Sequence, residues 1–190
     1  MRIARRRPPK RRLLPALGAG AAAVGAIGLG AAGVLLRRRR RAHDERSSMS
    51  QANKATARRF LEDAFNKGDL DVIDEICLPT VVDHDPAMPA DTSGIEALKQ
   101  LVAGYRAAFP DLRMTVEEQV GEGDLVATRW TARGTHEGEL MGVAPSGKQA
   151  TVTGITLDRF EDGRIAESWT NWDTLGLLKQ LGAVPMTSQV

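Results

Sequence analysis

From residue 51 onward, the apolar residues first recur every three or four positions, the spacing that places side chains on one face of a helix. Three segments share this spacing: 51–67, 69–79 and 93–110. Gly68 can end the first helix in a left-handed conformation, Pro79 stops the second, and Ser93 is the expected N-cap of the third. Residues 81–91 show no regular period and are predicted to be irregular.

Further along the chain the period changes to two, which is typical of strands that bury one face. Four segments alternate in this way: 112–120, 125–133, 149–160 and 165–172. The turn sequences Gly121-Glu-Gly-Asp124 and Glu161-Asp-Gly-Arg164 predict antiparallel hairpins, and residues 174–181 return to helical spacing. Helices grouped before strands predict an α+β domain, in which a cone-shaped, curved antiparallel sheet wraps around the N-terminal helices and leaves a cavity.

The N-terminal part of the chain has a different character. Residues 13–36 form a run of 24 uncharged residues. A helix of this length would reach about 36 Å, and the hydrocarbon core of a bilayer is about 30 Å thick. Arginines flank the run at 11–12 and 37–41, so we expect one transmembrane helix that is retained rather than cleaved. The alternatives are a cleaved or translocated segment, or a flexible basic tail that binds acidic polymers.

Charge divides the chain near residue 46. Residues 1–46 contain 13 Lys/Arg and 2 Asp/Glu, whereas the remainder contains 13 basic and 22 acidic residues, a net charge of −9. The folded domain is therefore not expected to bind nucleic acid. The expected organisation is a basic N-terminus at 1–12, the membrane span at 13–36, a basic and polar linker at 37–50, the domain at 51–184 and a tail at 185–190. Both flanks of the span are basic, so its orientation stays open, with the cytoplasmic side favoured for the domain.

Several separated motifs carry a family resemblance. They are Phe65-Asn-Lys-Gly-Asp69, Phe109-Pro-Asp-Leu112, Gly134-Thr-His-Glu-Gly138, Asp162-Gly-Arg-Ile-Ala-Glu167 and Asn171-Trp-Asp173. With these motifs in this order, residues 52 to 183 resemble the SnoaL-like polyketide cyclase, or ester cyclase, branch of the nuclear transport factor 2-like superfamily. The resemblance implies a cone-shaped α+β barrel, commonly dimeric through its sheet, with an apolar pocket inside.

The resemblance also implies where acid/base chemistry would lie. Family members that close polyketide rings by intramolecular aldol condensation use an aspartate on the strand that is 165–172 here, and Thr170 matches its position. The family's pocket glutamine and histidine match Gly154 and Thr156. A threonine hydroxyl cannot replace the aspartate at neutral pH, because a useful acid/base has a pKa near the working pH.

Alternation along the strands predicts which side chains share a face with Thr170. If Thr170 faces the cavity, then Thr156, Trp130 and Trp172 line it and are candidates for substrate binding. The alternative for the tryptophans is an ordinary core position. Glu167 falls on the opposite face and is expected to pair with an arginine of a neighbouring strand.

Three more residues are candidates for chemistry. His84, in the sequence Asp83-His-Asp85, is a candidate for proton transfer or substrate hydrogen bonding, and the alternatives are a metal ligand or a solvated loop residue. His136 is either a gate beside the pocket opening or a surface histidine. Asp173 is the second catalytic candidate, or else the N-cap of the last helix. No metal site and no cofactor are expected.

The sequence excludes several other function classes. It contains no phosphate-cradling loop, no dinucleotide-binding glycine motif and no nucleophile elbow. A single cysteine, Cys77, cannot form an internal disulfide. The leading hypothesis is a membrane-tethered homodimer that binds a small apolar carbonyl compound and acts on it by proton transfer, as a cyclase, isomerase or lyase. The alternative is a non-catalytic small-molecule-binding or assembly module tethered to the membrane.

Overall fold

The computed structural model of the chain describes residues 27–184. The chain divides into two units, Met1–Arg40 and Arg41–Val190. Among the described residues, no helix combines the length and the apolar character needed to cross a bilayer. Most of the expected membrane span, residues 13–26 of 13–36, lies outside the described part of the chain.

The first helices follow one another without a break. Helix α1 is Ile27–Arg59, and it continues directly into the π-helix η1, Phe60–Lys67. Residues 37–50, which the sequence suggested as a linker, are therefore helical throughout. Gly68 ends η1 in the left-handed conformation, with φ at 74°, in agreement with the sequence.

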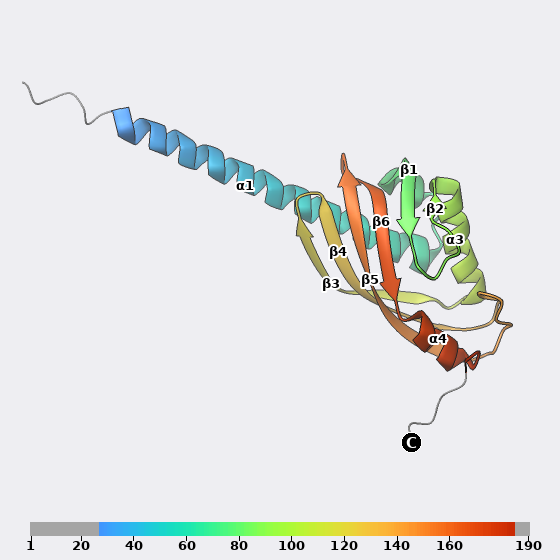
Figure 1. Cartoon of the computed structure of the whole chain (residues 1–190). Coiled ribbons are helices and arrows are strands. Elements are labelled where there is room, and N and C mark those ends of the chain that lie inside the picture. Colours follow the sequence, from blue (N-terminus) through green and yellow to red (C-terminus); the bar gives the residue numbers. More distant parts are fainter. Residues whose placement is uncertain (1–26, 185–190) are drawn as a thin grey trace, which may run out of the picture. The chain divides into compact units, whose positions relative to one another are not determined.

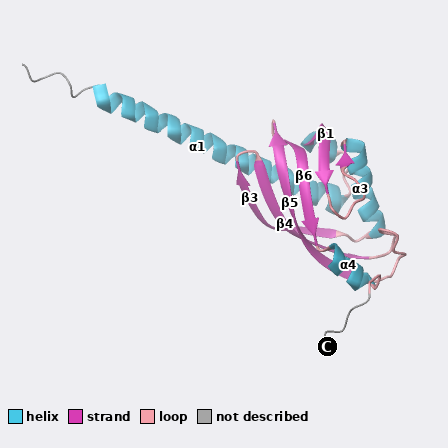
Figure 2. Cartoon of the chain, viewed as in Figure 1, coloured by secondary structure: helices cyan, strands magenta, loops and turns pink. Residues whose placement is uncertain are grey.

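Six strands form a single sheet in the order β2-β1-β6-β5-β4-β3. The strands are β1 Cys77–His84, β2 Thr92–Ser93, β3 Arg113–Glu122, β4 Leu125–Thr135, β5 Gln149–Glu161 and β6 Arg164–Trp172. The hairpins β3–β4 and β5–β6 are antiparallel, as predicted, and β4 also pairs antiparallel with β5. Together with η1, helices α2, Val72–Ile76, and α3, Ile95–Ala108, cover one face of the curved sheet, which gives an α+β domain (Figures 1 and 2).

Four local predictions were wrong. The second helix ends at Ile76 instead of at Pro79, which lies in strand β1. Residues 81–84 belong to strand β1 and are not irregular. Strand β1 pairs parallel with β6, so the sheet is mixed rather than purely antiparallel. Ser93 lies in β2, and the N-cap of α3 is Gly94, whose φ of 84° favours glycine. The acidic residues and prolines of this region made β1 difficult to recognise as a strand. In addition, its partner β6 comes from the far end of the domain sequence, so no local turn marks the pairing.

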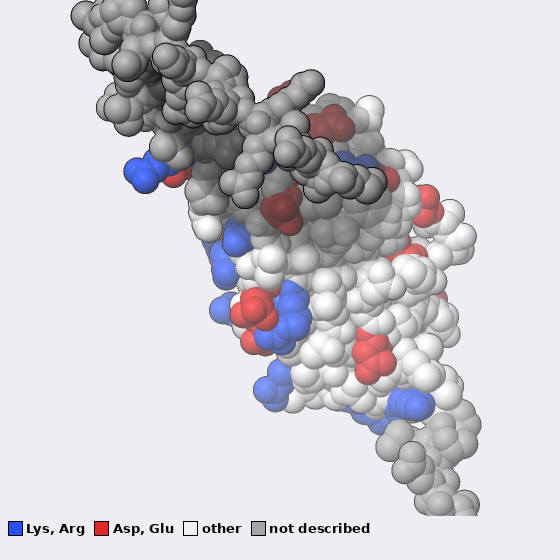
Figure 3. Space-filling model, turned by 60° about the vertical axis from the view of Figure 1, so that its left-hand side comes forward, with Lys and Arg blue, Asp and Glu red and all other residues white. Residues whose placement is uncertain are grey.

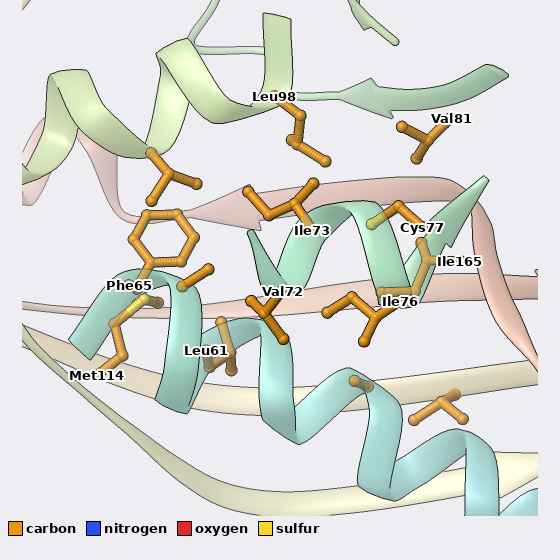
Figure 4. Close-up of a cluster of buried hydrophobic side chains, with 14 of the residues drawn as sticks. Leu61, Phe65, Val72, Ile73, Ile76, Cys77, Val81, Leu98, Met114 and Ile165 are labelled. Carbon is orange, nitrogen blue, oxygen red and sulfur yellow. The ribbon is translucent and has the colours of Figure 1, made fainter. Parts of the chain in front are cut away.

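The hydrophobic core lies between the helices and the sheet. Side chains from η1, α2, α3 and strands β1, β3 and β6 converge there (Figure 4): Leu61, Phe65, Val72, Ile73, Ile76, Cys77, Val81, Leu98, Met114 and Ile165. Removing this apolar surface from water is the main stabilising contribution to the fold. Burial also raises the pKa of the Cys77 thiol to about 12, so Cys77 is a structural residue without thiolate reactivity at neutral pH.

Helix α4, Thr174–Leu181, forms a second apolar cluster beyond the last strand (Figure 1). Its residues Leu177 and Leu181 pack with Phe109 and Ala150. The helix has the bounds that the sequence predicted, and Gly182 ends it in the left-handed conformation with φ at 85°.

The surface of the domain mixes both signs of charge. On the face drawn in Figure 3, basic residues follow the left edge with acidic residues among them, and uncharged residues cover most of the rest. Exposed ion pairs such as Arg58–Glu62 and Arg59–Glu75 contribute little stability each. The absence of nucleic-acid binding by the domain stays a prediction.

Candidate active site

A cavity of about 120 Å³ lies between the sheet and helices η1 and α3. This volume exceeds by far the space that one water molecule needs. Most of the lining side chains are apolar or aromatic, and the polar ones come mainly from β1, β5 and β6. The polar lining residues are Asp83, Asp85, Tyr105, Thr128, Arg133, Thr156, Asp158, Ser168 and Thr170.

The inward face of the strands is the one that alternation predicted. Thr170 lines the cavity, and so do Thr156, Trp130 and Trp172. Glu167 points to the other face, where its carboxylate pairs with the guanidinium of Arg159 on the neighbouring strand β5, as expected. Substrate binding by the inward residues stays a prediction.

A chain of hydrogen bonds crosses four strands and ends at Asp83. The indole Nε1 of Trp130 donates to Oγ1 of Thr156 at 3.0 Å. The hydroxyl oxygens of Thr156 and Thr170 are 3.1 Å apart, and the Thr170 hydroxyl donates to Oδ1 of Asp83 at 3.4 Å. An indole N–H can only donate and an ionised carboxylate can only accept, so both threonine hydroxyls direct their protons toward Asp83.

Gly154 makes the first bond of this chain possible. It lies directly opposite Trp130 in the pairing of β4 with β5. A Cβ atom at this position would come within 2.3 Å of Cζ2 of the Trp130 ring. The indole can therefore cross over the bare backbone of Gly154 and reach Thr156, two residues further along β5.

Asp83 is a buried carboxyl group, only 8% exposed. Burial raises the pKa of Asp83 to about 6, and the negative charge of Asp85 acts in the same direction. The hydrogen bond from Thr170 opposes this rise. At neutral pH, Asp83 is therefore mostly ionised and is still a stronger base than an exposed aspartate.

A second carboxyl group, Asp158 on β5, lies deeper in the fold at 6% exposure. Its Oδ1 accepts a hydrogen bond of 2.7 Å from the hydroxyl of Ser168 on β6. Burial raises the pKa of Asp158 to about 7, the hydrogen bond from Ser168 opposes the rise, and the charge of Asp83 adds to it. Asp158 thus keeps a proton over a large part of the neutral pH range.

A third carboxyl group and a phenol complete the polar lining. Oδ2 of Asp85 accepts a hydrogen bond of 2.9 Å from the indole Nε1 of Trp172. The ring of Tyr105 packs edge-on against Trp172, with centroids 6.4 Å apart. The buried Tyr105 hydroxyl has no hydrogen-bond partner among the described residues, and burial raises its pKa, so it stays a neutral donor.

The structure places His84 outside the cavity. Its Nδ1 lies 3.0 Å from Asp91 and its Nε2 lies 3.0 Å from Glu167, while its ring stacks on Trp169 with centroids 5.5 Å apart. The hydrogen bonds to Glu167 and Asp91 raise the pKa of His84. His84 is adjacent in sequence to Asp83 but faces the opposite side of β1, so it does not reach this cavity, and its catalytic role stays a prediction.

His136 is neither a surface residue nor a lining residue of the cavity. It is completely buried, and its ring packs against Phe109 at 5.3 Å between centroids. Its Nδ1 accepts a hydrogen bond of 3.2 Å from the backbone N–H of Ser146, which assigns the ring proton to Nε2. His136 therefore ties the segment around Ser146 to the end of β4. The surface alternative was wrong, and the role of His136 as a gate residue stays a prediction.

Asp173 is the N-cap of α4. Its exposed carboxylate accepts a hydrogen bond of 2.8 Å from the backbone N–H of Gly176. It does not line the cavity; the cap is confirmed, and the catalytic role of Asp173 stays a prediction. Within residues 27–184, no group of three His, Cys, Asp or Glu side chains is arranged to hold a metal ion.

Comparison with known proteins identifies the family. Residues 55–181 match the sequence model of the family described as SnoaL-like polyketide cyclase. The chain belongs to this family. It is 31% identical over 120 residues to the nogalonic acid methyl ester cyclase of Streptomyces nogalater, a match that covers 63% of this chain and 90% of that protein.

Solved structures of similar fold include one that is described as a putative SnoaL-like polyketide cyclase, from Jannaschia sp. CCS1. TsrD of Streptomyces laurentii superposes with a TM-score of 0.64 at 31% identity, over 70% of this chain and 97% of that chain. IdmH of Streptomyces antibioticus superposes with a TM-score of 0.59 at 40% identity, over 68% of this chain and 98% of that chain. The α+β domain is therefore the nuclear transport factor 2-like fold that the resemblance implied.

Sequence reasoning missed the roles of Asp83 and Asp158, two of the three carboxyl groups that line this SnoaL-like cavity. Asp158 shares the alternation of Gly154 and Thr156 along β5, so the signal was present in a strand that had been predicted. Asp83 was noticed only beside His84, because the segment was not recognised as a strand. Once β1 is known, Asp83 alternates with Val81 toward the inside, and His84 falls outside.

Proposed function

We propose that this SnoaL-like protein is a cyclase-type enzyme that transfers protons on a small apolar carbonyl compound, with Asp83 as the general base. The observation that carries the proposal is the hydrogen-bond chain from Trp130 through Thr156 and Thr170, whose protons all point toward the carboxylate of Asp83. The chain orients the carboxylate and stabilises its ionised form inside a cavity with mainly apolar walls.

The proposed chemistry starts with removal of a proton from the carbon next to a carbonyl group. A base of this kind works best when its pKa lies near the working pH. The pKa of Asp83, about 6, meets this condition better than the ordinary aspartate value of about 3.9. The neutral hydroxyl of Tyr105, which has no other partner within the described residues, is available to donate a hydrogen bond to the substrate.

The position of Asp83 compensates for the threonine at 170. By resemblance, the family's acid/base aspartate belongs at Thr170 on β6. Asp83 extends from the adjacent strand β1, and its Oδ1 lies 3.4 Å from the Thr170 hydroxyl. A carboxylate therefore reaches the same part of the cavity from the neighbouring strand. The ester cyclase names of the similar proteins support a substrate with carbonyl groups.

The rival function is a non-catalytic small-molecule-binding module. The observation in its favour is Thr170 itself, since a threonine replaces the residue to which the family's chemistry is attributed. The two functions differ in one measurable property, which is exchange of carbonyl α-protons with solvent.

The test uses the full-length chain and the bicyclic aromatic ketone indanone as a probe in deuterium oxide, followed by proton NMR. We expect the protein to accelerate loss of the α-proton signal, and Asp83→Asn to reduce this acceleration about 100-fold or more. The matched control is Asp162→Asn, which removes the same charge from an exposed turn and should leave the rate unchanged. The double variant Asp83→Asn/Thr170→Asp should regain part of the activity, because it restores a carboxylate at the family position.

Two results would contradict the proposal. An exchange rate no higher than that of buffer, with indanone bound to the protein, would favour the binding module. Equal rates for the parent and Asp83→Asn would show that another group removes the proton.

A further inference from the structure

Two aspartates and a serine lie side by side on three adjacent strands of the sheet, β1, β6 and β5, and form one rung. Asp83 on β1 is the pairing partner of Ser168 on β6, and Ser168 is in turn the partner of Asp158 on β5. All three side chains are buried and line the cavity. Neighbouring strands are about 4.8 Å apart, so the α-carbons of the two aspartates are about 10 Å apart with Ser168 between them.

The cavity offers these two carboxyl groups almost no positive charge. Arg133 is the only basic residue of the lining, its side chain is exposed, and its guanidinium donates to Gln149. Two carboxylates in one mainly apolar cavity repel each other, so ionising the first makes ionisation of the second less favourable. Their titrations are therefore linked.

The surroundings decide which of the two keeps the proton. Asp83 receives the hydrogen-bond chain through Thr170, and the nearby charge of His84 favours its ionised form, against the opposite influence of Asp85 and Asp91. Asp158 is more deeply buried, receives one hydrogen bond from Ser168, and feels the charge of Asp83. The proton is thus favoured on Asp158 and the negative charge on Asp83.

We infer that Asp158 is a second acid/base residue, which gives a proton to the substrate's carbonyl oxygen while Asp83 removes a proton from the adjacent carbon. This inference rests on the proposed function and divides its chemistry between two named carboxyl groups. Sites in which the environment separates the pKa values of two acids are suited to such a division.

The step balances without any further reactant. The C–H bond next to the carbonyl breaks, its proton goes to Asp83, and its electron pair forms a carbon–carbon double bond. The π electrons of the carbonyl move to oxygen, which takes the proton of Asp158. The product is the enol, with Asp83 protonated and Asp158 ionised. The hydroxyl of Ser168 donates to Asp158 and so stabilises the carboxylate that this step creates.

The first experiment does not depend on a substrate. Carbon-13 NMR of labelled aspartate side chains in the full-length chain should show one carboxyl, assigned to Asp158 by its loss in Asp158→Asn, that titrates well above the ordinary value of about 3.9. In Asp83→Asn its pKa should fall, because a neighbouring negative charge has been removed. An ordinary titration of Asp158, or a pKa that Asp83→Asn leaves unmoved, would overturn the inference.

The second experiment uses the indanone exchange assay over a range of pH. The parent should show a bell-shaped profile, since Asp83 must be ionised and Asp158 protonated. Asp158→Asn should reduce the maximal rate about 100-fold and remove the decline at high pH, while the rise governed by Asp83 remains. Asp162→Asn should change neither the rise nor the decline of the pH profile.

The outcomes separate the two proposals. Asp158→Asn could keep the parent's exchange rate and both the rise and the decline of its pH profile, while Asp83→Asn is inactive. In that case the proposed function stands and the role of Asp158 is refuted. If the parent binds indanone but does not accelerate exchange, both are refuted, whatever the titration shows.

Discussion

Thr170 is the residue at which this chain departs from the acid/base pattern that the resemblance implies. The variant Thr170→Asp would place a carboxyl group among Thr156, Asp83 and the apolar cavity wall. Burial and the like charge of Asp83 should both raise its pKa above the ordinary value. A raised folded-state pKa means that the folded protein binds the proton more tightly than the unfolded chain does.

The variant should therefore lose stability relative to its parent as the pH rises from about 4 toward the raised pKa. We expect the free energy of unfolding of Thr170→Asp to be lower by about 1 to 3 kcal/mol at pH 8 than at pH 5, after subtraction of the parent's own change. Urea titrations at the two pH values measure this difference. Equal stabilities, together with an ordinary titration of the new carboxyl group, would place residue 170 in contact with solvent.

Gly154 gives a second prediction at the scale of single residues. In Gly154→Ala the new Cβ would overlap the Trp130 ring, so the indole would have to move and its bond to Thr156 would break. We expect a loss of about 1 to 3 kcal/mol in unfolding free energy, measured by urea denaturation. The matched control is Gly104→Ala in α3, where no atom lies within 4 Å of the new Cβ and stability should rise by up to about 1 kcal/mol.

At the scale of elements, His84 joins strand β1 to strand β6 and to the segment before β2. Its imidazole pairs with Glu167 on β6 and with Asp91, and these partners raise its pKa above 6.5. A raised histidine pKa contributes stability that is fully present below the unfolded pKa and is lost as the pH rises through the folded pKa. The contact should therefore weaken from slightly acid toward alkaline pH.

We expect the melting temperature of the parent to exceed that of His84→Gln at pH 6, and the difference to shrink at pH 8. Differential scanning calorimetry of both proteins at the two pH values measures it. A difference between parent and His84→Gln that is independent of pH would contradict the prediction.

Some strands of the sheet could be predicted from the sequence, and one could not. The hairpins of β3 with β4 and of β5 with β6 were predictable, because their period and turn residues are local features. The strand β1 was not, because its parallel pairing with β6 is defined only by tertiary structure. This omission affected the choice of candidate residue. Because β1 was predicted to be irregular, His84 was proposed for proton transfer in place of its neighbour Asp83.

At the scale of the whole molecule, the outer face of the sheet predicts self-association. Ile155, on β5, is 51% exposed although it lies in the middle of the sheet, with half-buried Leu157 two residues further on. An apolar sheet face of this kind is typically covered in an oligomer. We expect a homodimer in sedimentation at micromolar concentration, and Ile155→Lys should shift the equilibrium to monomers. A concentration-independent monomer mass for the parent would refute the prediction.

The N-terminal part of the chain gives the remaining prediction. The uncharged run 13–36 with its arginine flanks should keep the full-length protein in the membrane pellet during carbonate washing. Salt weakens electrostatic adsorption but does not extract a spanning helix, so washing with concentrated salt should release nothing. Release by salt alone would instead indicate a basic tail bound to acidic polymers.

The pairing of β1 with β6 has a consequence for the order of folding. The hairpins β3–β4 and β5–β6 close short loops, whereas β1 and β6 are separated by most of the domain sequence, and closing a longer loop costs more conformational entropy. The strand that contributes Asp83 is therefore expected to join the sheet late. Partly folded chains would then contain Thr170 and Asp158 but no assembled rung, so the acid/base pair comes into existence only with the complete native topology.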